Sequence, residues 1–170
     1  VYKRQDVIFC PVSPNYAQLI IEAAAAQGFE GTILGGDTLD SNMVVEAAKG
    51  KDVDVKITTF YQEGGNPEFD AGIKEWINAN ADAKTNNGGN DVVAAVSALG
   101  YDAYMAAVAA IEKAQSADGT AIRDALAGLS IDLVTGSLSF DANGDAVKST
   151  AYIKQAINGS FQFYKVQSAD

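Results

Sequence analysis

The sequence predicts an α/β fold, because short apolar runs alternate with a helix-like segment near its start. Val7 to Cys10 and Thr32 to Leu34 have the character of strands, and Pro14 to Gln27 between them has the character of a helix. Together these segments predict a βαβ unit, in which two parallel strands are joined by a helix that covers the sheet. The chain of 170 residues is long enough for one domain with a sizeable core.

The ends of the first predicted helix carry matching start and stop signals. Ser13 can cap the helix, Pro14 suits its first position, and Gly28 can close it. The residues expected on its inward face are Leu19, Ile20, Ala23, Ala24 and Gln27.

The middle of the chain predicts one more strand and several helices. A short helix is expected around Ser41 to Ala48, followed by a strand from Val53 to Tyr61 with Val53, Val55 and Ile57 on one face. The next helix begins with Asn66 as its cap and Pro67 as its first residue, and it carries Phe69, Ile73, Trp76 and Ile77. A long Ala-rich helix is expected from about Asp91 to Gln115, and a further helix from Gly119 to Leu129. Packing in a core explains Trp76 at least as well as stacking on a ligand does.

The last third predicts antiparallel β structure. Strand-like runs cover Leu133 to Phe140, Ala151 to Ile157 and Phe161 to Val166, and Asn158-Gly159 is the signature of a type I′ hairpin turn. The segment Asp141-Ala-Asn143-Gly144-Asp145 fits a turn better than a calcium loop, because the EF-hand frame would place Ala146 at its glycine position and Tyr152 at its glutamate position.

Composition excludes several classes of function. The chain has 22 acidic and 12 basic residues, so its net charge of −10 disfavours nucleic acid and anionic membranes as partners. It has no histidine and one cysteine, Cys10, which excludes a Ser/His/Asp triad, histidine-ligated metals and an internal disulfide. We therefore predict no metal or cofactor, a buried Cys10, and no membrane span, since the longest apolar run is only Ala106 to Ile111.

Polar residues after the second strand form the main candidate site. The segment from Gly31 to Thr38 has the glycine spacing of a phosphate loop but places Asp37 where such a loop needs lysine, and a carboxylate repels phosphate. The carboxyl end of a strand in an open α/β sheet is nevertheless where ligands bind. Two alternatives remain open: Asp37 or Asp40 caps the next helix, or the two aspartates form an acid/base pair in an enzyme.

A set of motifs in a fixed order resembles one known family. The motifs are Asp6-Val-Ile-Phe-Cys10, Pro14 with Gln18, Ile33-Leu34-Gly35-Gly36-Asp37, Gly100-Tyr101-Asp102-Ala103, Gly119 with Ala121-Ile122-Arg123, and Val134-Thr135-Gly136 with Phe140-Asp141-Ala-Asn143-Gly144-Asp145. They resemble the C-terminal half of type I periplasmic solute-binding proteins, in particular the branched-chain amino acid (leucine/isoleucine/valine) group of ABC transporters.

The resemblance implies a two-lobed α/β fold, of which this chain holds an incomplete part. Residues 6–62 would be an α/β segment of the second lobe, residues 63–148 would return to the first lobe as helices and a β-hairpin, and residues 149–170 would form a C-terminal hairpin of the second lobe. The parallel sheet of the first lobe would be missing. Residues 1–5 read as the translated end of a sequencing adapter, so we expect them to be artificial and leave them out.

The same resemblance implies a function without chemistry. The protein would capture an amino acid or similar small polar ligand between two lobes by hinge closure and deliver it to an ABC transporter permease, in the periplasm or outside the cell, with lipid anchoring of the full-length parent left open. Asp37 matches the acidic residue that meets the ligand's α-amino group, Val12 and Ser13 match cleft-lining positions, and Thr38 is added as their neighbour. The alternatives are a ligand-sensing domain of a receptor or regulator on the same fold, and a small enzyme that uses Asp37 and Asp40.

Overall fold

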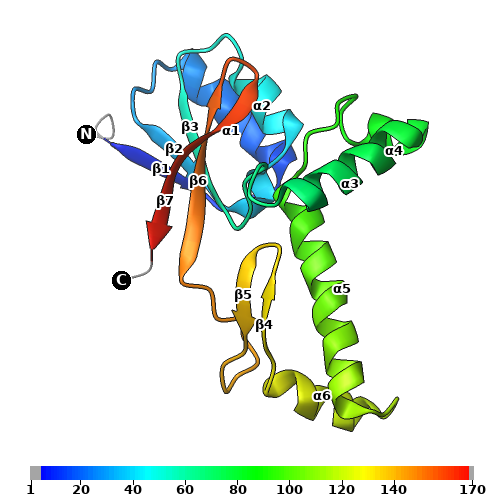
Figure 1. The fold of residues 1–170 in the computed structure, drawn as a ribbon. Coiled ribbons are helices and arrows are strands. Elements are labelled where there is room, and N and C mark those ends of the chain that lie inside the picture. The colour runs from blue at the N-terminus through cyan, green and yellow to red at the C-terminus, as the bar shows by residue number, and fades with distance from the viewer. Residues whose placement is uncertain (1–4, 169–170) are drawn as a thin grey trace.

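A five-stranded mixed sheet organises the computed structural model, which describes residues 5–168 (Figure 1). Strands β1 (Val7–Cys10), β2 (Thr32–Gly35) and β3 (Asp54–Thr59) are parallel to one another. Strands β6 (Thr150–Ile157) and β7 (Ser160–Ser168) join antiparallel beside β3, so the sheet order is β1-β2-β3-β6-β7. Most of the segment that we expected to be artificial, residues 1–4, lies outside the described residues.

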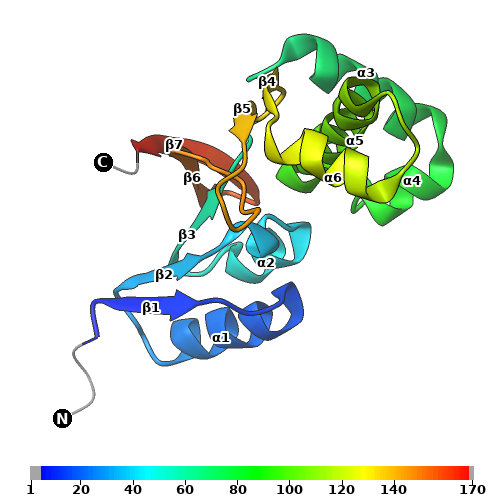
Figure 2. The same cartoon turned by 90° about the horizontal axis from the view of Figure 1, so that it is seen from below.

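Helices α1 (Pro14–Ala26) and α2 (Asn42–Ala48) cover one face of this sheet (Figure 2). The predicted βαβ unit is confirmed, with β2 leading into a 3-10 turn, η1 (Asp37–Leu39). The largest side chains of the core between helices and sheet are fully buried: Ile21, Ile33, Leu39, Val44, Val55 and Ile57. Cys10 is buried among them as predicted, and this burial raises the pKa of its thiol.

The expected inward face of α1 is wrong in part. Ala17, Ile21 and Ala24 are the buried residues of the helix, whereas Leu19 is 60% exposed and Ala23 and Gln27 face solvent. Two alanines on the buried face let the helix backbone lie close to the sheet, which a face centred on Leu19 would prevent. Apolar periodicity alone was ambiguous here because nearly every residue from Leu19 to Ala26 is apolar.

The opposite face of the sheet is not covered by any helix among residues 5–168 (Figure 2). Val7 and Phe9 of β1 are 52% and 67% exposed. Toward the centre of the sheet, Asp54 accepts hydrogen bonds from Thr32 Oγ1 at 2.5 Å and from Gln155 Nε2 at 2.9 Å, and also pairs with Lys56. The sheet therefore has one dry face and one open face with apolar and charged side chains.

After β3 the chain leaves the sheet and forms a second region of helices and a hairpin (Figure 1). Its elements are α3 (Pro67–Ala79), α4 (Ala81–Asn86), α5 (Ala95–Ala114), α6 (Gly119–Ala127), β4 (Ser130–Leu133) and β5 (Gly136–Ser139). The predicted start of α3 is confirmed, since the Asn66 side chain accepts a hydrogen bond from Phe69 N at 3.0 Å. Its expected core residue Trp76 is 60% exposed, because no sheet among the described residues lies against that side of α3.

Two other predictions for this region are wrong about where the elements begin and end. Leu133 to Phe140 contains the end of β4, a turn and β5 rather than one strand, because Gly136 adopts a φ of +94° that turns the chain back on itself. The long helix begins at Ala95 rather than Asp91, and the short helix α4 was not predicted.

The turns predicted near the C-terminus are confirmed. Asn158 and Gly159 have φ values of +51° and +83°, as a type I′ hairpin requires. The Asp141 carboxylate accepts hydrogen bonds from Asn143 N at 2.8 Å and Asp145 N at 2.9 Å, and Gly144 supplies the left-handed residue of that turn. Within residues 5–168, no helix has both the length and the apolar character of a membrane span.

Candidate functional site

The four residues predicted to bind a ligand lie at one edge of the sheet. Cys10 is opposite Gly35 in the parallel pairing of β1 and β2, so the loops that follow these strands emerge side by side. Thr38 Oγ1 lies 3.5 Å from the carbonyl oxygen of Val12, which links the two loops directly. We call Val12, Ser13, Asp37 and Thr38 the strand-end site.

The turn that carries Asp37 is fixed by the packing of Leu39 and by backbone hydrogen bonds. Leu39 is fully buried and fills the space that a side chain at Gly35 would need. The carbonyl of Gly36 accepts a hydrogen bond from Leu39 N at 3.1 Å, and the carbonyl of Asp37 accepts one from Asp40 N at 3.0 Å. Packing and hydrogen bonds thus fix the backbone of the turn while the Asp37 side chain remains half-buried.

The Asp37 carboxylate has spare capacity for a ligand. Thr38 N, at 3.0 Å, is the only donor bonded to it among residues 5–168, whereas an ionised carboxylate can accept about four hydrogen bonds. Ser13 is similar: its carbonyl accepts the bonds that start α1, and its exposed side chain makes no capping bond. The expected capping role of Ser13 is therefore carried by its backbone alone.

Neither aspartate of the alternative interpretations caps helix α2. Ser41 does so, since its hydroxyl accepts a hydrogen bond from Met43 N at 3.3 Å. The Asp40 carboxylate instead bonds to Lys154 Nζ at 2.8 Å and shares no hydrogen bond with Asp37. The geometry therefore gives no support to an acid/base pair of Asp37 and Asp40.

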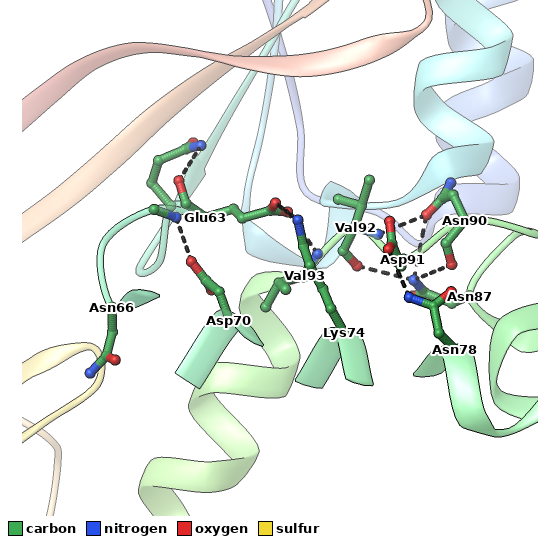
Figure 3. A network of polar contacts seen from close by, with 12 residues as sticks. Glu63, Asn66, Asp70, Lys74, Asn78, Asn87, Asn90, Asp91, Val92 and Val93 are labelled. Atoms are coloured by element: carbon green, nitrogen blue, oxygen red, sulfur yellow. Dashed lines mark hydrogen bonds and ion pairs between the residues drawn. The ribbon is translucent and has the colours of Figure 1, made fainter. Parts of the chain in front are cut away.

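A polar network that the sequence did not reveal lies where the chain leaves β3 (Figure 3). Asp70 accepts hydrogen bonds from the Tyr61 hydroxyl and from Gly64 N, both at 2.6 Å. Burial and the Asp70 carboxylate raise the pKa of Tyr61 well above its ordinary value. Glu63 accepts a hydrogen bond from Val93 N at 2.9 Å and also pairs with Lys74. These contacts fasten α3 and the start of α5 to the segment that follows the sheet.

A second buried carboxylate holds the β4–β5 hairpin against α5. Asp102 accepts hydrogen bonds from Val134 N at 2.9 Å, Thr135 N at 2.8 Å and Thr135 Oγ1 at 2.6 Å. Lys148 Nζ lies 2.8 Å from Thr135 Oγ1; burial lowers the pKa of Lys148, against the opposing effect of Asp102. We call the hydrogen bonds between Asp102 and the hairpin the clamp. The family resemblance included the motif around Asp102 and the Val134-Thr135-Gly136 segment, but it gave neither of them a role.

Comparisons with known proteins agree on one fold. The sequence model of a periplasmic binding protein family matches residues 3–160. The leucine binding protein LivK from Thermotoga maritima superposes with a TM-score of 0.74 at 30% identity, over 96% of this chain and 45% of that one. The branched-chain amino acid transporter substrate binding protein LivJ from Streptococcus pneumoniae, solved with isoleucine, gives 0.65 at 24% identity, over 96% and 44%. None of the curated protein sequences compared matches the chain significantly.

A more distant structure shows the same fold. The solute binding protein of an ABC transporter from R. palustris, solved with benzoate, gives a TM-score of 0.71 at 18% identity, over 96% of this chain and 43% of that one. The chain thus spans less than half the length of all three proteins.

Three parallel strands, with Asp37 at their carboxyl edge, and two antiparallel strands that complete the sheet form an α/β unit. The family match covers more than half of the chain, and the chain belongs to the periplasmic binding protein family. The predicted type I periplasmic-binding-protein-like fold, present over about half of the solved chains, is thereby confirmed.

Proposed function

We propose that this chain is part of a two-lobed solute-binding protein of an ABC importer, and that Asp37 binds the ammonium group of an amino acid. The observation that carries the proposal is the half-buried Asp37 carboxylate, which is fixed at the carboxyl edge of the sheet and bonded to one backbone donor within residues 5–168. A charge-assisted hydrogen bond from an ammonium group would satisfy its remaining acceptor sites. The likeness to LivK, which is described as a leucine binding protein, favours a branched-chain amino acid.

The rest of the strand-end site supplies the surroundings of that contact. The Ser13 hydroxyl and the Thr38 side chain are exposed at the same edge, and Val12 contributes an apolar surface beside them. None of these four positions holds an aromatic residue. A carboxylate-binding group is supplied by the opposite lobe in this proposal.

We further propose that the two regions of the chain belong to different lobes. All five strands of the main sheet come from residues 6–62 and 149–170, whereas residues 63–148 form the separate helical region (Figure 1). Ligand capture would then occur by movement of one lobe against the other about the segments that join them. The partner would be an ABC transporter permease, the location periplasmic or extracellular, and no reaction would take place.

Calorimetric titration of L-leucine, L-isoleucine and L-valine into the full-length protein that carries this segment tests the proposal. We expect saturable binding of at least one of them, with a matching rise in melting temperature because the ligand binds the folded state. The 170-residue chain alone should bind the same amino acid weakly or not at all, since the cleft needs groups from both lobes and residues 5–168 hold no parallel sheet of the first lobe. Absence of binding in the full-length protein, or turnover of the amino acid, would overturn the proposal.

A further inference from the structure

The buried ion pair of Asp40 and Lys154 stands apart from the other ion pairs of residues 5–168. Its two side chains are 7% and 6% exposed, whereas each of the other four pairs keeps at least one side chain 29% exposed or more. Burying two charges costs free energy that their attraction repays only in good geometry, so such a pair is poor evidence for stability. The pair is better explained by a role in fixing the positions of the residues around it.

The surrounding structure is arranged to make this contact. Lys154 sits on the central part of β6, opposite Ile57 of β3, and faces the side of the sheet that α1 and α2 cover. A register shift in the pairing of β6 with β7 falls between Ile153 and Lys154. The pairing skips Tyr164, so the extra residue lies on β7, next to the point where β6 carries the buried charge.

Asp40 joins three separate parts of the chain. Its backbone N–H closes the turn that carries Asp37, with Asp37 O at 3.0 Å, and its carboxylate bonds Lys154 of β6 at 2.8 Å. The same Oδ2 atom lies 3.4 Å from the N–H of Ala95, the first residue of α5. Ala94, the capping residue of α5, has no side chain that can accept this bond, so Asp40 supplies a cap from 55 residues away.

We propose that Asp40 and Lys154 are positioning residues for Asp37: the buried pair locks the turn of residues 36–40 to β6 and to the start of α5. The turn then holds the Asp37 carboxylate in place. Because Ala95 belongs to the helical region, the same lock couples the ligand-binding turn to the region that moves on hinge closure. The ligand part of this inference rests on the proposed function above.

The test compares Lys154→Met and Asp40→Asn with Lys49→Met in the full-length protein that carries this segment. Lys49 is the matched control, since it pairs with Glu46 on α2 at the surface, with side chains 58% and 62% exposed. The first measurement is hydrogen–deuterium exchange of the peptide covering residues 36–41, at a temperature where circular dichroism shows all variants folded. We expect the amides of Leu39 and Asp40 to exchange about tenfold faster in Lys154→Met and Asp40→Asn, and Lys49→Met to match the wild type.

The second measurement is the affinity for L-leucine by calorimetry under the same conditions. We expect about a tenfold rise in Kd for Lys154→Met, a smaller rise for Asp40→Asn, which keeps an oxygen for Ala95 N–H, and none for Lys49→Met. A lowered melting temperature with unchanged exchange at residues 36–41 would show a purely structural pair and overturn the inference.

The two measurements also separate this inference from the proposed function. If the wild-type protein does not bind the amino acid, the proposed function fails, and the exchange measurement still decides whether the pair locks the turn. If Lys154→Met does not fold, Asp40→Asn decides in its place, and unchanged exchange there overturns the inference.

Discussion

The sheet region and the helical region of this chain are held together in different ways. In the sheet region, helices α1 and α2 bury a continuous core of large apolar side chains against hydrogen-bonded strands. In the helical region the buried clusters are small, one around Tyr61 and Val93 and one around Leu129 and Leu138. Buried carboxylates, Asp70 and Asp102, supply much of the connection there.

The two regions differ in the core that each forms by itself. The sheet region has a dry core of its own, so its strand ends can present polar side chains in fixed positions. The helical region has only small buried clusters, and its Trp76, Val96, Tyr104 and Ile111 are between 46% and 68% exposed. The sheet region also exposes large apolar side chains, among them Phe9 and Leu19, beside its continuous core. A surface of this kind is typical of an interface that a further part of a protein covers.

The largest effect should come from removing core volume in the sheet region. Ile57→Ala deletes a fully buried side chain in the core between the helices and the sheet, and such a cavity costs about 3 kcal/mol of unfolding free energy. Trp76→Ala in the helical region removes a larger side chain that is 60% exposed, and should change stability by less than about 0.5 kcal/mol. Denaturant unfolding of the 170-residue chain measures both; equal losses would abolish the contrast between the regions.

An intermediate effect is expected from the clamp on the hairpin. Asp102→Ala leaves the half-buried donors Val134 N and Thr135 N without their acceptor, which costs about 2 kcal/mol and releases the β4–β5 turn. Hydrogen exchange of residues 130–139 should accelerate while exchange of β1–β3 stays unchanged. Asp132→Ala, on the exposed side of the same hairpin, is the control and should leave exchange of the turn as it is.

The smallest effect concerns the open face of the sheet and depends on pH. Burial opposes ionisation of Asp54, but hydrogen bonds from Lys56, Thr32 and Gln155 outweigh it, so the pKa of Asp54 is lowered on folding. Its contribution to stability is present above pH ~4, the unfolded value, and disappears as pH falls through the lower folded pKa. Asp54→Asn should therefore cost less than about 1 kcal/mol at pH 7 and nothing in strong acid. Melting curves from pH 2 to 7 would contradict this if the difference between the two proteins grew toward acid.

Local patterns in the sequence predicted the parts of the fold that local interactions determine. The first βαβ unit follows from apolar runs with a proline at the helix start, and the β6–β7 hairpin follows from Asn158-Gly159. The Asp37 turn was a candidate site because it follows a strand, but the pattern alone did not separate a ligand site from a helix cap. The family resemblance selected Asp37, Val12 and Ser13, with Thr38 as their neighbour, and the structure places all four at one edge.

Interactions between distant residues account for what the sequence did not reveal. The turn of the β4–β5 hairpin is stabilised by Asp102, 32 residues before Val134, and the start of α5 by Asp40 and Glu63. Lys154 meets Asp40 across 114 residues, so nothing near Lys154 in the sequence indicates that its charge is buried. Periodicity also placed Trp76 in a core, because an amphipathic pattern does not show whether a partner surface is present.

The most direct test of the central claim is calorimetric titration of L-leucine into the full-length protein with Asp37→Ala, Asp37→Asn and Asp118→Ala. Asp118 is a true helix cap, accepting hydrogen bonds from Thr120 N and Ala121 N at 3.0 Å, so its loss should cost about 1 kcal/mol of stability without changing affinity. A charge-assisted hydrogen bond is worth about 1.5 to 3 kcal/mol, so Asp37→Ala should weaken binding by about tenfold to a hundredfold, with Asp37→Asn in between. If Asp37→Ala instead behaved like Asp118→Ala, with a lower melting temperature and unchanged affinity, Asp37 would not be the residue that binds the ligand.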